Sequence, residues 1–340
     1  MNKFSFEHFS GLPIDYEEFI IERYKSFITT CQYIKIYFPN DDYHYTLVKE
    51  GDNINEIFIY GIKENSCNCY NSLVSIDQDV IKQFAESIFS NFPTLNKIKY
   101  AASYLSYNLK KSFLASTAND YILNLPSKMD DYYSNIGTTT RRHLKNYKSK
   151  LLRDYPNTRF VKKTGIEIKK ELIDKIVQLS YRRMKSKGII PGKDEKDAID
   201  FYKYSQFYGQ VSYIELNGVI IAGSISYLLN DRFFLFMIAH DNDFSKYNPG
   251  QLCIIFSVQE AIDMKMKTFH FLWGDNDYKV RLGANQKLIS SYIFYKSYSF
   301  GFFVSKFKAG LSRFLLAARQ SKYAKPLRDA IKGFRKNKNR

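Results

Sequence analysis

The sequence predicts a mixed α/β protein, close to the α+β class, with two lobes that each contain a mixed, mostly antiparallel sheet flanked by helices. Three observations support this prediction. Apolar residues make up 45% of the 340 residues, enough for one large core or two ordinary ones. Pro126 ends a first run of expected strands and helices, and a basic segment follows it. In the second run a three-strand meander precedes single helices and strands, which is not an alternating βαβ series.

The first lobe is predicted for residues 1–135. Apolar residues at helical spacing predict helices over Asp15–Thr30 and Asp79–Asn91, and Pro93 ends the second of these. Apolar segments bounded by turn residues predict the strands Tyr43–Lys49, Glu56–Ile62, Lys97–Tyr100 and Tyr121–Leu125.

A basic bridging helix is predicted for residues 136–157. Thr138, Thr139 and Thr140 offer a helix start, and the Arg and Lys residues that follow recur on several faces of the helix. Two interpretations remain open. The helix is either a solvated connection between the lobes or a wall that attracts anions.

The second lobe is predicted for residues 158–300. The expected helices are Ile168–Ser186, Asp197–Tyr208, Leu252–Lys265 and Asp277–Leu282. The expected strands are Gln210–Leu216, Val219–Leu228, Arg232–His240, Thr268–Trp273 and Ile289–Tyr298. Asn217-Gly218 lies between the first two strands and is the strongest hairpin signal in the chain.

Charge and cysteine content narrow the function classes. Lys and Arg number 51 against 34 Asp and Glu, so the net charge of +17 favours anionic partners such as nucleic acid, acidic lipid or phosphorylated substrates. A single residue separates Cys67 from Cys69, which is not the two-residue spacing of common zinc motifs, and the sequence has no second pair of cysteines. No metal site is therefore expected. Few cysteines and no apolar run long enough for a signal peptide or a membrane span predict a cytoplasmic protein.

Common nucleotide and hydrolase motifs are missing from the sequence. It contains neither a P-loop nor Gly-x-Gly-x-x-Gly, which argues against a nucleoside triphosphatase and a dehydrogenase. Ser224 lies between apolar residues with no Gly-x-Ser-x-Gly around it, which argues against a serine hydrolase.

Residues 210–285 carry a family resemblance. The strand Ile220–Ser224 follows a hairpin, Phe234–Asp241 forms the next strand, and Tyr247–Leu252 leads into a helix. In Phe269–Gly283 an expected strand is followed by Gly-Asp, then by Tyr-Lys and a further Gly. Together these segments resemble the core of a GNAT acyltransferase, in particular the CelD-like branch of bacterial polysaccharide and cell-envelope biosynthesis. That branch has two GNAT-like lobes, like the Fem-type peptidyl transferases.

The resemblance implies an acyl-CoA donor bound at the start of a helix. Asn248-Pro249-Gly250 leads into the helix that contains Gln251 and Leu252, and free N–H groups at a helix N-terminus attract phosphate oxygens. In the family this turn meets the pyrophosphate of coenzyme A, and Lys279 is a further candidate for holding a phosphate. Only Gly250 stands where a loop richer in glycine is common, so an acylated carrier or aminoacyl-tRNA remains an alternative donor. A plain helix-start turn is the other interpretation.

Four residues are candidates for the transfer chemistry. Acyl transfer to an amine needs a group that takes the proton of the amine. Asp275 is the first candidate and His240 the second, with Asp241 beside it, and Tyr278 is placed to protonate the leaving thiolate. Structural alternatives are a helix cap for Asp275, a turn cap for Asp241 and core packing for Tyr278.

The tail, residues 301–340, is basic and amphipathic. Apolar residues recur at helical spacing from Phe303 to Ala318, and Asp329 is the one acidic residue. This pattern is typical of a helix on an anionic membrane surface, and also of a terminal helix docked on the protein.

Taken together, the sequence predicts an N-acyltransferase that needs no metal. Its donor would be acyl-CoA and its acceptor an amine, such as an amino sugar of envelope or exopolysaccharide precursors, attacking directly in a ternary complex. One alternative is a Fem-like aminoacyl-tRNA-dependent ligase, which the positive charge favours. A second is a non-catalytic protein that binds RNA or membrane on a degenerate GNAT scaffold.

Overall fold

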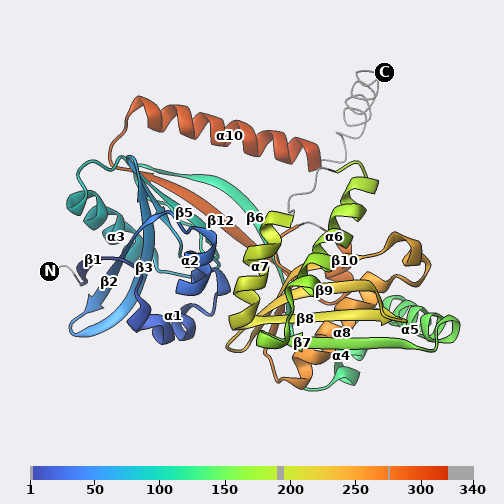
Figure 1. Cartoon of the computed structure of the whole chain (residues 1–340). Helices are drawn as coiled ribbons and strands as arrows, with labels where there is room; N and C mark the ends of the chain where they lie inside the picture. The colour runs from blue at the N-terminus through green and yellow to red at the C-terminus, as the bar shows by residue number, and fades with distance from the viewer. Residues whose placement is uncertain (1–2, 190–194, 275, 321–340) are drawn as a thin grey trace.

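One continuous sheet of twelve strands runs through the computed structural model (Figure 1), which describes residues 3–189, 195–274 and 276–320. The strands lie in the order β1-β2-β3-β4-β5-β12-β6-β11-β10-β9-β8-β7. The two predicted lobes therefore share one sheet, with the first five strands at one end and β7–β10 at the other.

The first lobe contains five strands and three helices before the chain reaches the centre of the sheet. Its strands are β1 (Ser5–Ser10), β2 (Asp42–Glu50), β3 (Asn53–Lys63), β4 (Ser66–Cys69) and β5 (Lys97–Ser103). Its helices are α1 (Glu17–Tyr24), α2 (Cys31–Tyr37) and α3 (Gln78–Asn91). Buried side chains of β3 and α3 form its core, where the rings of Phe58 and Phe84 stack.

Three central strands join the lobes. The long strand β6 (Ser112–Asn124) pairs with β12 (Asn285–Tyr295) over most of its length and with β11 (Thr268–His270) at its end. β12 also pairs with β5, so residues 285–295 lie in the sheet between strands of the first lobe. The predicted second lobe, residues 158–300, therefore includes one strand that pairs with a strand of the first lobe.

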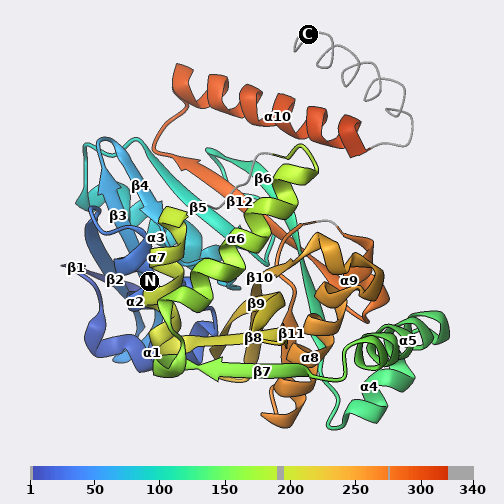
Figure 2. The same cartoon turned by 45° about the vertical axis from the view of Figure 1, so that its right-hand side comes forward.

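The second lobe follows α4 (Met129–Asn135) and α5 (Thr138–Asp154). Its strands are β7 (Thr158–Thr164), β8 (Gly209–Leu216), β9 (Val219–Leu229) and β10 (Arg232–His240), which precede β11. Its helices are α6 (Lys170–Ser186), α7 (Glu195–Tyr208), α8 (Pro249–Asp263) and α9 (Asp277–Arg281). The last described helix, α10 (Phe300–Gln320), lies along the outer edge of the molecule in Figures 1 and 2.

Most predicted elements are present, with local differences that have physical causes. The turn Asn217-Gly218 has positive φ at both residues and joins β8 to β9, as the hairpin signal predicted. The single helix expected over Asp15–Thr30 ends at Tyr24, because Lys25 adopts a left-handed conformation. The strand expected over Thr268–Trp273 ends at His270.

A buried aromatic cluster holds the lobes together on one face of the sheet. Phe27, in a short 3-10 helix of the first lobe, is 1% exposed and contacts the rings of Tyr204, Tyr227 and Phe234 from the second lobe. The hydroxyl of Tyr204 donates to the carbonyl oxygen of Phe27 at 2.8 Å. Since this cluster combines apolar burial with a buried hydrogen bond, it fixes how the lobes meet.

The replacement Phe27→Ala is therefore expected to lower the free energy of unfolding by about 3–5 kcal/mol, because a buried ring leaves a cavity that its neighbours fill only in part. Chemical denaturation of the two proteins measures this change. The matched control is Phe207→Ala on α7, where the side chain is 55% exposed and a change below about 1 kcal/mol is expected. Equal effects of the two replacements would contradict the role of the cluster.

Candidate functional site

The strands β10 and β11 diverge at the centre of the second lobe. They run parallel and pair only from Arg232 to Phe234 on β10 and from Thr268 to His270 on β11. β11 then ends, whereas β10 continues to His240 and carries a bulge between Leu235 and Met237 against β9. Within the described residues, the edge of β10 beyond Phe234 therefore has no strand partner on the side of β11.

A buried lysine holds the chain where it leaves β11. The ammonium of Lys279 donates to the carbonyl oxygens of Phe271, Leu272 and Trp273 at 3.1, 2.9 and 2.9 Å, and the residue is 2% exposed. These bonds satisfy three carbonyl groups that no strand pairs. The geometry favours this structural role for Lys279 over the phosphate contact that the resemblance implied.

A cavity of about 320 Å³ lies where the bridging helix α5 meets the start of α8 and α9. Its lining is polar and partly cationic, and comprises Thr139, Thr140, His143, Tyr147, Asn248, Gln251, Tyr278, Arg281 and Leu282. Leu144 and Leu151 of α5 are buried, so the helix is packed against the lobe. We call this cavity the α8 pocket. Its lining supports the interpretation of the bridging helix as a wall that attracts anions.

The start of α8 offers fewer free N–H groups than the sequence suggested. Asn248 is left-handed, with φ of 49°, and Pro249 occupies the first helical position. The N–H groups of Gln251 and Leu252 donate to the carbonyl oxygen of Asn248 at 3.0 and 3.2 Å. The positive end of the helix dipole remains, but an anion here needs side-chain donors as well. Leu252 is buried in the core and is a packing residue.

Gly250 lies against the imidazole of His240. A Cβ atom added at Gly250 would come within 2.6 Å of Nδ1 of His240, closer than a real Cβ contact. Glycine at this position therefore lets the end of β10 approach the first turn of α8. The requirement for glycine here comes from packing against the ring.

The surroundings of His240 keep its ring neutral at pH 7. Burial, together with the positive charges of Arg183 and Lys187 on and beside α6, lowers the pKa of His240 to about 4, against a smaller opposite effect of Asp241. A base with so low a pKa is weak toward an ammonium group. This electrostatic environment disfavours His240 as the general base and favours negative charge nearby.

The other predicted catalytic residues have separate positions. The side chain of Asp241 accepts from the N–H of Asp243 at 3.1 Å and caps the 3-10 helix Asn242–Tyr247. Tyr278 lines the α8 pocket, and burial raises its pKa, so its hydroxyl keeps its proton at neutral pH. Asp275 lies outside the described residues.

A second cavity, of about 580 Å³, lies between the lobes. Its walls come from α1, from loops of the first lobe, and from β6, β10, β11 and β12. The polar residues among its lining are Arg23, Ser75, Tyr104, Asn124, Arg232, Thr268, His270, Asn285, Gln286 and Lys287. We call it the inter-lobe cavity. Sequence reasoning did not find it, because its walls come from segments far apart in the chain.

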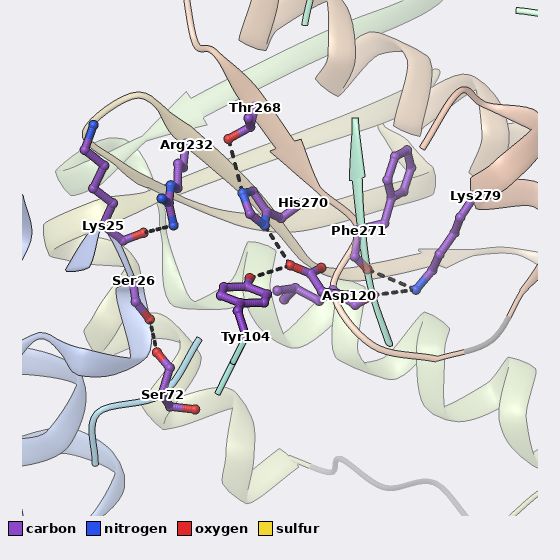
Figure 3. Close-up of polar contacts among 11 residues, drawn as sticks. Lys25, Ser26, Ser72, Tyr104, Asp120, Arg232, Thr268, His270, Phe271 and Lys279 are labelled. Atoms are coloured by element: carbon purple, nitrogen blue, oxygen red, sulfur yellow. Dashed lines mark hydrogen bonds and ion pairs between the residues drawn. The ribbon is translucent and has the colours of Figure 1, made fainter. Parts of the chain in front are cut away.

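A buried carboxylate and imidazole lie at the wall of the inter-lobe cavity (Figure 3). Asp120 is fully buried and accepts from Nδ1 of His270 at 2.8 Å and from the hydroxyl of Tyr104 at 2.7 Å. Nε2 of His270 lies 3.1 Å from the hydroxyl of Thr268. Burial alone would raise the pKa of Asp120, but the hydrogen bonds from His270 and Tyr104 leave it below its usual value. Asp120 is thus an ionised carboxylate.

Comparison with known proteins identifies the fold. Residues 139–280 match the family model described as acetyltransferase (GNAT) domain. The solved structure described as FemX has a TM-score of 0.63 and 9% sequence identity, and the match covers 85% of this chain and 97% of that chain. The chain has the two-lobed fold of the GNAT superfamily.

A second similar structure has no stated activity. It is a conserved protein of unknown function from Bacteroides thetaiotaomicron, with a TM-score of 0.53 and 12% identity, and the match covers 84% of this chain and 98% of that chain. No curated protein matches the sequence. The GNAT fold related to Fem-type transferases is therefore confirmed, whereas the narrower CelD-like resemblance stays a prediction.

Both cavities lie near the point where β10 and β11 diverge. The α8 pocket lies at the end of β10, and the inter-lobe cavity lies at the paired part of β11. Among the described residues, no three side chains of the His, Cys, Asp and Glu types come together as a metal site.

His240 predicts a specific loss of stability in acid. Its folded-state pKa of about 4 lies below the usual 6.5, so the unfolded chain binds more protons between these values. Stability is therefore unaffected by this group above about pH 6.5 and falls as pH is lowered toward 4. Because the ring is partly exposed, we expect a contribution of about 1–2 kcal/mol.

The replacement His240→Gln removes this titration. Urea unfolding between pH 7 and pH 4 should show a shallower loss of stability in the variant than in the original protein. His143→Gln, which changes a histidine of the α8 pocket, is the control and should keep the original slope. An unchanged slope in His240→Gln would show that the ring is not held neutral in the folded state.

Proposed function

We propose that the protein transfers an acyl group from acyl-CoA to an amine by direct attack in a ternary complex. The observation that carries this proposal is the α8 pocket, where the start of α8, the basic helix α5 and α9 meet at the end of β10. A GNAT domain indicates an acyl-transfer fold in general, and the pocket suggests where the donor would bind.

The charges around the α8 pocket support a phosphate-bearing donor. His143 and Arg281 line it, and Arg183 is close enough to influence the pKa values of both His240 and Tyr278. With the helix dipole of α8, these groups make the pocket favourable for the pyrophosphate of coenzyme A. Beyond Phe234 the edge of β10 has no strand partner on the side of β11 within the described residues. This edge leads away from the pocket and offers backbone groups to the extended arm of the donor.

The chemical step needs two proton transfers. The amine loses a proton, its lone pair forms a bond to the thioester carbonyl carbon, and the carbon–sulfur bond breaks. The leaving thiolate takes up a proton. The hydroxyl of Tyr278 keeps its proton and is a candidate donor, but its claim is weak because the extended arm carries the sulfur away from the α8 pocket that Tyr278 lines. Asp275 remains a candidate acceptor for the proton of the amine, while the low pKa of His240 weakens its claim.

Donor binding is tested by exchanging one amide for a carboxylate. Gln251→Glu places a negative charge in the α8 pocket, where it should repel coenzyme A and weaken binding at least about tenfold. A carboxylate in the first turn of a helix does not destabilise it, so the melting temperature without ligand should not fall. Thermal shift with coenzyme A and short acyl-CoAs measures both effects.

The control variant is Gln78→Glu, the same exchange in the first turn of α3, which should leave the shift unchanged. Stabilisation by acyl-CoA in the original protein and in Gln78→Glu, but not in Gln251→Glu, supports the proposal. If no thioester stabilises the original protein, the acyl-CoA proposal is wrong. A salt-sensitive interaction with tRNA would then favour the aminoacyl-tRNA-dependent alternative. Binding of RNA or membrane without transfer would favour the non-catalytic one.

The acceptor proposed from the CelD-like resemblance is an amino sugar of envelope or exopolysaccharide precursors. Such precursors are attached to membrane lipids, and α10 offers a surface that suits a membrane. Phe302 faces the sheet and is buried with Phe113 and Tyr295, whereas Phe300, Phe303, Phe307 and Leu311 are 85%, 58%, 73% and 48% exposed. We call these four side chains the α10 face.

The spacing and surroundings of the α10 face favour an anionic lipid surface. Its members follow one another at three or four residues and so lie on one side of the helix. Lys306 and Lys308 are exposed beside them, and residues 321–340 add many basic side chains to the sequence. Exposed aromatic rings flanked by positive charge suit the interface of an acidic bilayer. Within the described residues, no helix has the length and apolarity needed to cross a bilayer.

Peripheral binding is tested with vesicles. The double replacement of Phe303 and Phe307 by Ser should weaken binding to vesicles rich in phosphatidylglycerol at least about tenfold, since less apolar surface enters the interface. Co-sedimentation at low and moderate salt measures it. Phe207→Ser, an exposed ring on α7, is the control and should bind like the original protein. Equal binding of all three proteins would exclude the α10 face as the contact.

A further inference from the structure

The inter-lobe cavity gathers its polar residues on one face of the central sheet. Register alone brings them together: Arg232 pairs with Thr268 across β10 and β11, and Lys287 pairs with Asp120 across β12 and β6. His270 follows Thr268 by two residues, so its side chain points to the same face. The cluster is therefore built from four neighbouring strands.

The positive charge at this cavity is not fully neutralised. Arg23 forms an ion pair with the buried carboxylate of Glu56. Arg232 donates to the carbonyl oxygen of Lys25 at 3.2 Å, and the ammonium of Lys287 lies 4.2 Å from the centre of the Tyr104 ring. Neither Arg232 nor Lys287 has an ion pair within the part of the chain that the structure describes. An anionic group in the cavity would be attracted by both.

A chain of hydrogen bonds connects the cavity with the buried carboxylate. The Asp120 carboxylate accepts from Nδ1–H of His270, which leaves Nε2 with its lone pair directed at the half-buried hydroxyl of Thr268. Asp120 thus fixes the tautomer and the orientation of the ring. A positioned base oriented by a second group is the arrangement that proton transfer requires.

The hydrogen-bonded residues Thr268, His270 and Asp120 lie on the opposite face of these strands from helix α8. Phe233, Tyr121 and Phe269 alternate with the cavity residues along β10, β6 and β11, and they pack in the core with side chains of α8. Beyond His270 the strand β11 ends and the edge of β10 has no strand partner on that side among the described residues. An extended donor that follows this edge from the α8 pocket approaches His270.

We propose that the inter-lobe cavity receives the acceptor and that Thr268, His270 and Asp120 form the relay that takes the proton of its amine. This inference rests on the proposed acyl transfer and adds the acceptor side of the site. The cavity suits an amine that also carries an anionic group, which Arg232 and Lys287 hold. The sequence predicts Asp275 or His240 for this proton transfer.

The transfer balances as follows in atoms and charge. The hydroxyl of Thr268 gives its proton to Nε2 of His270 and takes one from the ammonium of the acceptor. The free amine then forms the carbon–nitrogen bond as the carbon–sulfur bond of the thioester breaks, and the leaving thiolate takes the second proton of the nitrogen, so that an amide and a free thiol result. The imidazolium of His270, held beside Asp120, releases its proton to solvent when the product leaves. Thr268 and His270 meet the reacting proton, and Asp120 is a positioning residue.

The test uses the full-length protein labelled with ¹⁵N in its five histidines. His143 lies in the α8 pocket and His270 at the inter-lobe cavity, so one spectrum reports on donor and acceptor sides separately. Coenzyme A should shift the signal of His143. Inorganic phosphate and glucosamine 1-phosphate should shift the Nε2 signal of His270, and Arg232→Gln should abolish that shift. The Nδ1 signal of His270 should be that of a protonated nitrogen.

The kinetic arm measures thiol release from acetyl-CoA with glucosamine 1-phosphate, and with glucosamine as the uncharged comparison. We expect the phosphorylated amine to react at least tenfold faster at low concentration. His270→Gln and Thr268→Val should lower kcat at least a hundredfold without changing the coenzyme A shift at His143. His44→Gln removes another histidine–aspartate pair, in the first lobe, and should remain active.

A pH profile separates a catalytic from a structural role. The original protein should lose kcat/KM on the acid side with one titrating group, and Asp120→Asn should move that limb to lower pH, while Asp42→Asn, in the histidine–aspartate pair of the first lobe, leaves it in place. The charged and titratable groups that surround His270 are Asp120 on β6, Tyr104 after β5, Arg232 on β10, Lys287 on β12 and Arg23 on α1.

The outcomes distinguish this inference from the proposed function. If coenzyme A shifts His143 but neither phosphate nor the amine shifts His270, the inter-lobe cavity is not the acceptor site and the inference is wrong. A profile in His270→Gln that keeps its acid limb also overturns the relay. If coenzyme A fails to shift His143, the acyl-CoA donor is wrong, and the response of His270 to phosphate still decides whether the cavity binds an anion.

Discussion

The short pairing of β11 with its two neighbours determines most of this structure. β11 spans Thr268–His270, and it pairs antiparallel with β6 and parallel with β10. These few hydrogen bonds connect the sheet of the first lobe to that of the second. Because β11 ends where β10 continues, the two strands diverge there. The edge of β10 then has no strand partner on that side among the described residues. The ammonium of Lys279 stabilises the chain beyond that end by satisfying three carbonyl groups.

The two faces of these strands have different physical characters. One face is apolar and packs beneath α8, with the α8 pocket at the helix start. The other carries a buried, ionised carboxylate whose Oδ2 atom accepts hydrogen bonds from His270 and Tyr104. A fully buried carboxylate is costly unless it is paired and hydrogen-bonded, so this network needs every member. The same chemistry that makes the network stable also orients an imidazole toward a cavity.

Positive charge recurs around both cavities, but it comes from different parts of the chain. At the α8 pocket it comes from α5, α6 and the dipole of α8. Burial and the charges of Arg183 and Lys187 together lower the pKa of His240 to about 4. At the inter-lobe cavity it comes from Arg232 and Lys287 on adjacent strands. The net charge of +17 is thus partly concentrated where anionic donors and acceptors of acyl groups would bind, while the basic tail concerns a separate surface.

Local signals in the sequence determined the elements: the Asn217-Gly218 hairpin, the strand Arg232–His240 and the helix after Asn248 follow from turn chemistry and periodicity. They also led to the prediction that a donor binds at the start of α8. The tertiary structure alone decided that the ammonium of Lys279 donates to backbone carbonyl groups and that Gly250 makes room for the ring of His240. It also decided that His270 contacts Asp120, 150 residues away in the sequence. Strand register sets such pairs, and register depends on contacts between segments far apart in the chain.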